Sequence, residues 1–152
     1  MKKFVPDDFV VPEKLETEKF RLRMLTVDDV EKDYEAVMSS RDHIKNLYCE
    51  EDYGTWPEEN MTIEENLEDL RRHQSEFLER ASFTYTVMSL DESICLGCVY
   101  INPSKRKDFD AEIDFWSRAS ETENEFENLL YSTIKKWVKD KWPFGNVAYP
   151  GR

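Results

Sequence analysis

Residues 83–117 read FTYTVMSLDESICLGCVYINPSKRKDFDAEIDFWS, and they carry the clearest fold signal in the sequence. It contains three segments rich in β-branched and aromatic residues, at 83–90, 94–102 and 110–117. Only Asp91-Glu92 and a polar loop that holds residues 105–107 separate them. Because connections this short join antiparallel neighbours, the sequence predicts a three-stranded meander.

Helical patterns precede the meander. Residues 20–25 alternate apolar and basic side chains, which is typical of a half-buried strand. Thr26 then opens a helix that runs to about residue 40, and Thr62 with Glu65 forms a capping box for a second helix that ends near residue 80. Residues 41–61 are predicted to form a short helix and an ordered loop.

A third helix and a last strand follow the meander. Apolar residues recur at helical spacing over 123–142, and Pro143 ends the pattern. Residues 145–149 predict a short strand that is parallel to the strand before it, because a helix crosses between the two. The 152 residues therefore predict one α+β domain, with a mixed, mainly antiparallel sheet flanked by helices, an irregular segment at 1–19 and an apparent end at the fifth strand.

Charge and hydropathy limit the partners and the location. The formal net charge of -12 disfavours binding to nucleic acid and to anionic membranes, and it attracts cationic partners such as small amines. No apolar run approaches the roughly 20 residues of a membrane-spanning helix, and the N-terminus lacks a signal-peptide pattern, so we expect a cytoplasmic protein. The basic cluster at 105–107 is interpreted as a solvated hairpin turn, with a local anion site as the alternative.

The cysteine and histidine patterns favour no metal and no nucleophile. Cys49, Cys95 and Cys98 are expected to be free thiols, as in a reducing compartment. Cys95 and Cys98 are three residues apart on a predicted strand, so we expect them on opposite faces and predict no metal site. His43 and His73 accompany no nucleophile motif and are interpreted as surface or boundary residues.

The strongest candidate for acid–base chemistry is a pair of acids on the predicted strand at 110–117. Glu112 and Asp114 alternate with apolar residues and should therefore project from one face. Two neighbouring carboxylates can raise each other's pKa, as a general base that deprotonates an amine requires. The alternative is that both acids belong to a solvated face of the sheet.

The positions of four aromatic residues allow two interpretations. They could line a ligand cleft, or they could pack in the core or at its rim, as strand aromatics more often do. The four are Trp56, Tyr85, Tyr100 and Trp116.

The predicted order of strand, two helices, meander, helix and strand resembles the GNAT superfamily of acyl-CoA-dependent N-acetyltransferases. Residues 20–29 resemble its opening R-L-R-x-L-x-x-x-D pattern, residues 96–101 its third strand, and residues 113–118 the strand before its coenzyme loop. The resemblance implies acetyl-CoA as co-substrate and an amine as acceptor. It also implies that the coenzyme's pantetheine arm binds the backbone of Phe115, Trp116, Ser117 and Arg118.

The chain departs from that family at the pyrophosphate loop. Residues 122–127, TENEFE, contain none of the glycines of the family's loop. Thr122 and Glu125 would instead form a capping box, and acidic side chains would occupy the helix N-terminus that a pyrophosphate would need. The sequence also stops at Arg152, before the family's next helix, which suggests either a shortened chain or a reduced fold.

Two functions remain open from the sequence. The first is N-acyl transfer from acetyl-CoA to an amine, with Glu112 or Asp114 as the base and an atypical coenzyme site. The second is a catalytically inactive module of the same fold that binds a small molecule or a protein partner.

Overall fold

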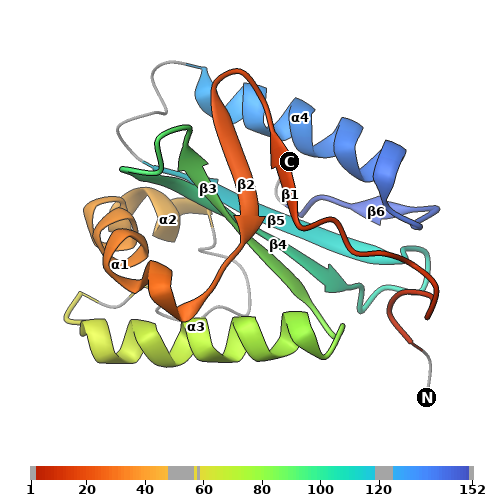
Figure 1. Ribbon diagram of the computed structural model, residues 1–152, viewed down its shortest axis with the longest axis horizontal. Helices are drawn as coiled ribbons and strands as arrows, with labels where there is room; N and C mark the ends of the chain where they lie inside the picture. Colours follow the sequence, from red (N-terminus) through yellow and green to blue (C-terminus); the bar gives the residue numbers. More distant parts are fainter. Residues whose placement is uncertain (1–2, 48–56, 58, 119–124, 151–152) are drawn as a thin grey trace.

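A computed structural model describes residues 3–47, 57, 59–118 and 125–150. These residues form a mixed α+β structure around one six-stranded sheet, whose strands lie side by side in sequence order (Figure 1). The predicted fold class is therefore confirmed. The strands are β1 (Lys14–Glu16), β2 (Phe20–Met24), β3 (Phe83–Ser89), β4 (Cys95–Pro103), β5 (Ala111–Ser117) and β6 (Val147–Ala148).

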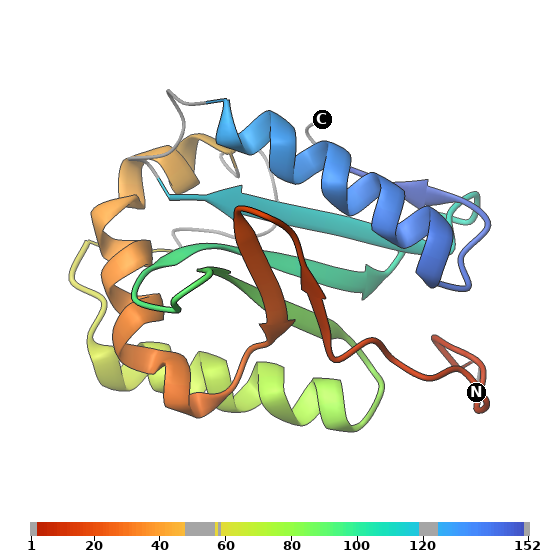
Figure 2. The same cartoon turned by 45° about the horizontal axis from the view of Figure 1, so that its top comes forward.

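Helices cover both faces of the sheet (Figures 1 and 2). One face carries the 3-10 turn η1 (Val27–Asp29) with α1 (Val30–Ser39), α2 (Arg41–Leu47) and α3 (Ile63–Leu78), and the other carries α4 (Phe126–Lys141). Apolar side chains of α4 pack with those of β2–β5 in one core cluster, and apolar residues of α1, α2 and α3 pack with Met88 and Trp116 in a second. Both faces of the central strands β3, β4 and β5 are therefore largely buried.

The strand pairing confirms the predicted meander and the parallel last strand. Neighbouring strands from β1 to β5 are antiparallel. The pairing of β5 with β6 is parallel and is limited to Ala111 with Val147 and Glu112 with Ala148. Towards Ser117, β5 has no strand partner on that side within the described residues. The described pairing of β5 with β6 therefore ends at Glu112.

The segment 1–19 was predicted to be irregular. Residues 14–16 instead form the strand β1, which pairs with β2. The predicted caps at Thr26 and Thr62 are present. Asp29 accepts a hydrogen bond from the Thr26 backbone N–H at 2.9 Å, and Thr62 and Glu65 cap α3 reciprocally. These local hydrogen bonds satisfy helix N–H groups that would otherwise lack a partner.

The start of α4 differs from the prediction. The helix begins at Phe126, and Glu125 is the N-cap residue, in a left-handed conformation with φ of 58°. Thr122, which was predicted to cap this helix, is therefore not its N-cap, and residues 122–124 lie outside the described part of the chain. Cys49 and Trp56 also lie outside it.

The prediction that Cys95 and Cys98 face opposite ways is wrong. The β3–β4 register moves from Val87 opposite Gly97 to Met88 opposite Cys95, so Leu96 is an extra residue in β4. Such a β-bulge interrupts the alternation of side chains. Cys95 and Cys98 both pack in the cluster under α1 and α3, whereas Leu96 packs on the α4 face.

Candidate functional site

The two predicted carboxylates do lie on one face of β5, but that face is covered. Asp114 is only 7% exposed, and Trp116, which follows it on the same face, is fully buried among residues of α1 and α3. The alternative of a solvated sheet face is therefore wrong for this part of β5. Glu112 is partly exposed and accepts a hydrogen bond from the Ser104 hydroxyl at 3.2 Å.

The side chains at the end of β5 are tied into the fold. The Phe115 ring packs on Tyr131 of α4, with 5.6 Å between centroids. The Ser117 hydroxyl donates to a Glu127 carboxylate oxygen at 3.1 Å. Arg118 donates from both terminal nitrogens to Glu35 of α1, at 2.6 and 2.5 Å. The side chains of these residues hold the strand in place, so a ligand would meet its backbone.

The direction of the backbone groups follows from the register. The Arg118 N–H donates to the Leu96 carbonyl of β4 at 2.7 Å. Because hydrogen-bonding direction alternates along an antiparallel strand, Trp116 also points its backbone groups at β4. Ile113, Phe115 and Ser117 point theirs at the opposite edge, on the side of β6. Of the predicted coenzyme-binding residues, Phe115 and Ser117 therefore present their backbone to that edge.

An acidic residue occupies the start of α4, as the sequence predicts. Glu127 lies in the first helical turn, and one of its carboxylate oxygens accepts a hydrogen bond from the Ser117 hydroxyl. The same oxygen lies 3.4 Å from Nε2 of His43 on α2. A carboxylate at a helix N-terminus is stabilised by the helix dipole and competes with any other anion for that position.

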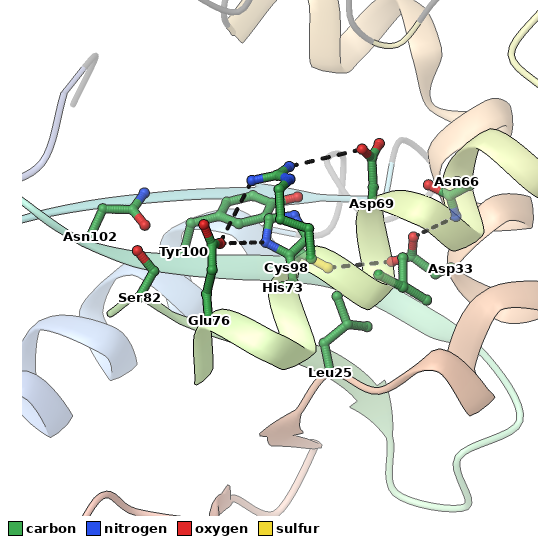
Figure 3. A pocket seen from close by; sticks show the side chains of 12 residues that line it. Leu25, Asp33, Asn66, Asp69, His73, Glu76, Ser82, Cys98, Tyr100 and Asn102 are labelled. Carbon is green, nitrogen blue, oxygen red and sulfur yellow. Dashed lines mark hydrogen bonds and ion pairs between the residues drawn. The ribbon is translucent and has the colours of Figure 1, made fainter. Parts of the chain in front are cut away.

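A cavity of about 400 Å³ lies between α3 and the face of the sheet that carries Glu112 and Asp114 (Figure 3). Tyr100 and Asn102 of β4 line it. Tyr100 is the cross-strand partner of Asp114, and Asn102 is the partner of Glu112. The Tyr100 hydroxyl also accepts a hydrogen bond from the Trp116 indole at 2.9 Å. The cavity is therefore next to the predicted catalytic pair.

A buried carboxylate closes one end of the cavity. Asp33 of α1 is 3% exposed and accepts hydrogen bonds from the Asn66 amide at 2.9 Å and the Cys98 thiol at 3.4 Å. Burial raises the pKa of Asp33 to about 6. The contact with Cys95, together with burial, raises the pKa of Cys98 well above its usual value, so Cys98 remains a thiol.

His73 forms part of the cavity wall. Its Nδ1 lies 3.1 Å from the Thr84 hydroxyl, and its ring centroid lies 5.6 Å from that of Tyr100. Burial lowers the pKa of His73 to about 4, so the ring is neutral at pH 7. His73 is a boundary residue, as expected, but no sequence pattern indicates that it lines one cavity with Tyr100 and Asp33.

Neither a metal cluster nor a membrane helix occurs in the part of the chain that the structure describes. No three His, Cys, Asp or Glu side chains there are grouped as metal ligands would be. Among the same residues, no helix combines the length and apolar character needed to cross a bilayer.

The fold is that of the GNAT acetyltransferases. The chain superimposes with a TM-score of 0.63 on ribosomal-protein-S5-alanine acetyltransferase from Vibrio fischeri, at 14% identity, covering 82% of this chain and 66% of that one. A putative ribosomal-protein-serine acetyltransferase from Vibrio cholerae gives 0.62 at 14% identity, with 90% and 69% covered. Microcin C7 self immunity acetyltransferase MccE, solved with acetyl-CoA and AMP, gives 0.60 at 13% identity, with 88% and 71% covered.

The chain spans about two thirds of the length of these structures. No family model matches the sequence, and no curated protein matches it. At this level of identity, the likeness establishes the fold and leaves the activity to be argued from the site.

Proposed function

We propose that the protein transfers an acyl group from acetyl-CoA to an amine. The observation that carries the proposal is the arrangement around β5. The described pairing of this strand's outer edge with β6 ends at Glu112, and its covered face carries Glu112 and Asp114 beside a cavity. An acyl donor on the edge and an amine in the cavity would approach the same strand.

The backbone of β5 offers a place for the donor. Phe115 and Ser117 direct N–H and C=O groups to the outer edge of β5, and the pantetheine arm carries amides that can pair with a strand edge. MccE, which has the same fold, was solved with acetyl-CoA. Because Glu127 occupies the first turn of α4, we expect the pyrophosphate to lie away from that helix N-terminus.

The chemistry needs a proton acceptor and a polarised carbonyl. Glu112 or Asp114 accepts a proton from the ammonium, directly or through water, and the freed amine attacks the thioester carbon. The C–N bond forms, the C–S bond breaks, and coenzyme A leaves as a thiolate that takes up a proton. The Ser117 N–H faces the edge and would polarise the carbonyl, whereas the Trp116 N–H faces β4.

A second candidate is a binding module without acyl transfer. The Ser117–Glu127 hydrogen bond favours it, because it places a carboxylate where relatives of this fold would need an anion site. In that case the cavity would bind a small molecule, and the edge of β5 would remain without a donor.

Release of coenzyme A tests the proposal. Acetyl-CoA is supplied at millimolar concentration with 1,5-diaminopentane, 2-phenylethylamine or a peptide with a free N-terminal serine, and the new thiol is measured. We expect turnover that falls about a hundredfold in Glu112→Gln or Asp114→Asn. Asp108→Asn is the control, because this exposed acid lies in the β4–β5 loop. Absence of turnover with all three amines would favour the binding module.

A further inference from the structure

The cavity under α3 has carboxylates towards both ends. In Figure 3, Glu76 lies near Ser82 and Asn102 at one end, and Asp33 lies near Asn66 at the other. Glu76 is about one-third exposed, whereas Asp33 is almost fully buried. The cavity therefore runs from a partly open acidic end to a closed acidic end.

The middle of the cavity is apolar and aromatic. Figure 3 shows His73 and Tyr100 between the two ends, and Leu25 lies across from them. The His73 and Tyr100 rings are tilted by 41° to each other with 5.6 Å between their centroids, and they offer a surface on which methylene groups can pack. His73 is neutral at pH 7, so it adds no positive charge there.

The charges of the cavity are not balanced by the described side chains. Arg72 is shared by two acids, at 3.8 Å from Asp69 and 3.6 Å from Glu76, and its side chain is 58% exposed. Asp33 receives hydrogen bonds only from the neutral groups of Asn66 and Cys98 among its described contacts. A buried carboxylate with neutral partners gains most from a cationic ligand that reaches it.

We propose that this cavity binds a linear diamine, with one ammonium at Glu76 and the other at Asp33. The methylene chain lies against Tyr100 and His73. Asn102 lies at the Glu76 end and is the cross-strand partner of Glu112. The ammonium at that end is the one placed for acylation, and this assignment of the acceptor rests on the proposed function.

A titration without coenzyme tests binding on its own. The probes are 1,5-diaminopentane, n-pentylamine and 1,5-pentanediol, which share a five-carbon chain and carry two, one and no positive charges. The readout is the indole N–H signal of Trp116, because this group donates to the hydroxyl of cavity residue Tyr100. We expect the diamine to bind at least about tenfold more tightly than n-pentylamine, and the diol to bind most weakly.

Matched variants locate the two charges. Glu76→Gln and Asp33→Asn should each bring the diamine to the affinity of n-pentylamine. Glu68→Gln, which removes the same charge from an exposed position of α3, should change it by less than about twofold. If Asp33→Asn fails to fold, diamines of three, five and eight carbons replace it, and the affinity should peak at one length that spans the cavity.

Equal affinity for the diamine and n-pentylamine would overturn the inference, as would equal losses in Glu68→Gln and Glu76→Gln. Diamine binding that depends on Glu76, without release of coenzyme A, would support the cavity assignment and contradict acyl transfer. Acylation of an amine that is unaffected by Glu76→Gln would support acyl transfer and contradict the assignment of the cavity as the diamine site.

Discussion

His73 and Asp33 line the same cavity and respond to acid in opposite directions. Burial lowers the pKa of His73 to about 4. Between pH 6.5 and pH 4, His73 is therefore protonated in the unfolded chain and neutral in the folded protein. The pKa of Asp33 is raised to about 6 by burial, so the folded protein takes up that proton before the unfolded chain does. As the pH falls, His73 destabilises the fold and Asp33 stabilises it.

The variant His73→Gln isolates the histidine contribution, because Asp33 is present in both proteins and its effect cancels in the comparison. Urea unfolding is measured from pH 7.5 to pH 4. Relative to the variant, the wild type should lose on the order of 3 kcal/mol between pH 6.5 and pH 4, and nothing above pH 7. Parallel stability profiles over the whole range would contradict the burial of a neutral His73.

Some single residues follow from the sequence, and others do not. The shared face of Glu112 and Asp114 follows from alternation along a regular strand. The shared face of Cys95 and Cys98 does not, because the bulge at Leu96 depends on how β3 pairs with β4. Gly97 lies at that bulge, where a Cβ would be 2.1 Å from the Trp116 carbonyl oxygen. This close approach also depends on tertiary structure, because it arises from the pairing of β4 with β5.

At the scale of elements, α3 determines the shape of the cavity. It contributes Asn66, Asp69, His73 and Glu76 from successive turns of one face. Its first turn is fixed by Thr62, whose hydroxyl accepts the Glu65 N–H at 3.2 Å. Loss of this cap would loosen the end of the helix that carries Asn66, the partner of Asp33.

Thr62→Ala should therefore lower the free energy of unfolding by about 1 kcal/mol, the usual cost of losing a helix N-cap. Ser75→Ala is the control, since it also removes a hydroxyl from α3. Ser75 is solvent-exposed and lies within the helix rather than at its end, where alanine is the better helix former. Urea unfolding at pH 7 measures both. Equal stability of the two variants would show that the capping box contributes nothing to the folded protein.

Element order was predictable because strong local signals mark it. Capping boxes at Thr26 and Thr62, short connections in the meander and the stop at Pro143 all operate within a few residues. The strand β1 was missed because three residues carry too little periodicity. The start of α4 was misplaced because Glu125 adopts a left-handed conformation that no local preference of glutamate predicts.

In the whole molecule, two regions border the strand β5: the cavity under α3 and the outer edge of the strand. The cavity lies on the α3 face, whereas α4 lies along β5 on the other face (Figure 2). The sequence located β5 and the acids on it, because both depend on local pattern. It could not locate the cavity, because Asp33, His73 and Tyr100 come from three distant segments.

If the protein transfers an acyl group as proposed, the edge of β5, rather than the N-terminus of α4, should hold the acyl donor. The most direct measurement is a titration of the ¹⁵N-labelled protein with acetyl-CoA, in which the backbone amide signals of both elements are followed. We predict saturable shifts centred on the amides of Phe115 and Ser117, with smaller shifts at Glu127. Shifts centred on the first turn of α4, or no shifts at millimolar acetyl-CoA, would contradict the account.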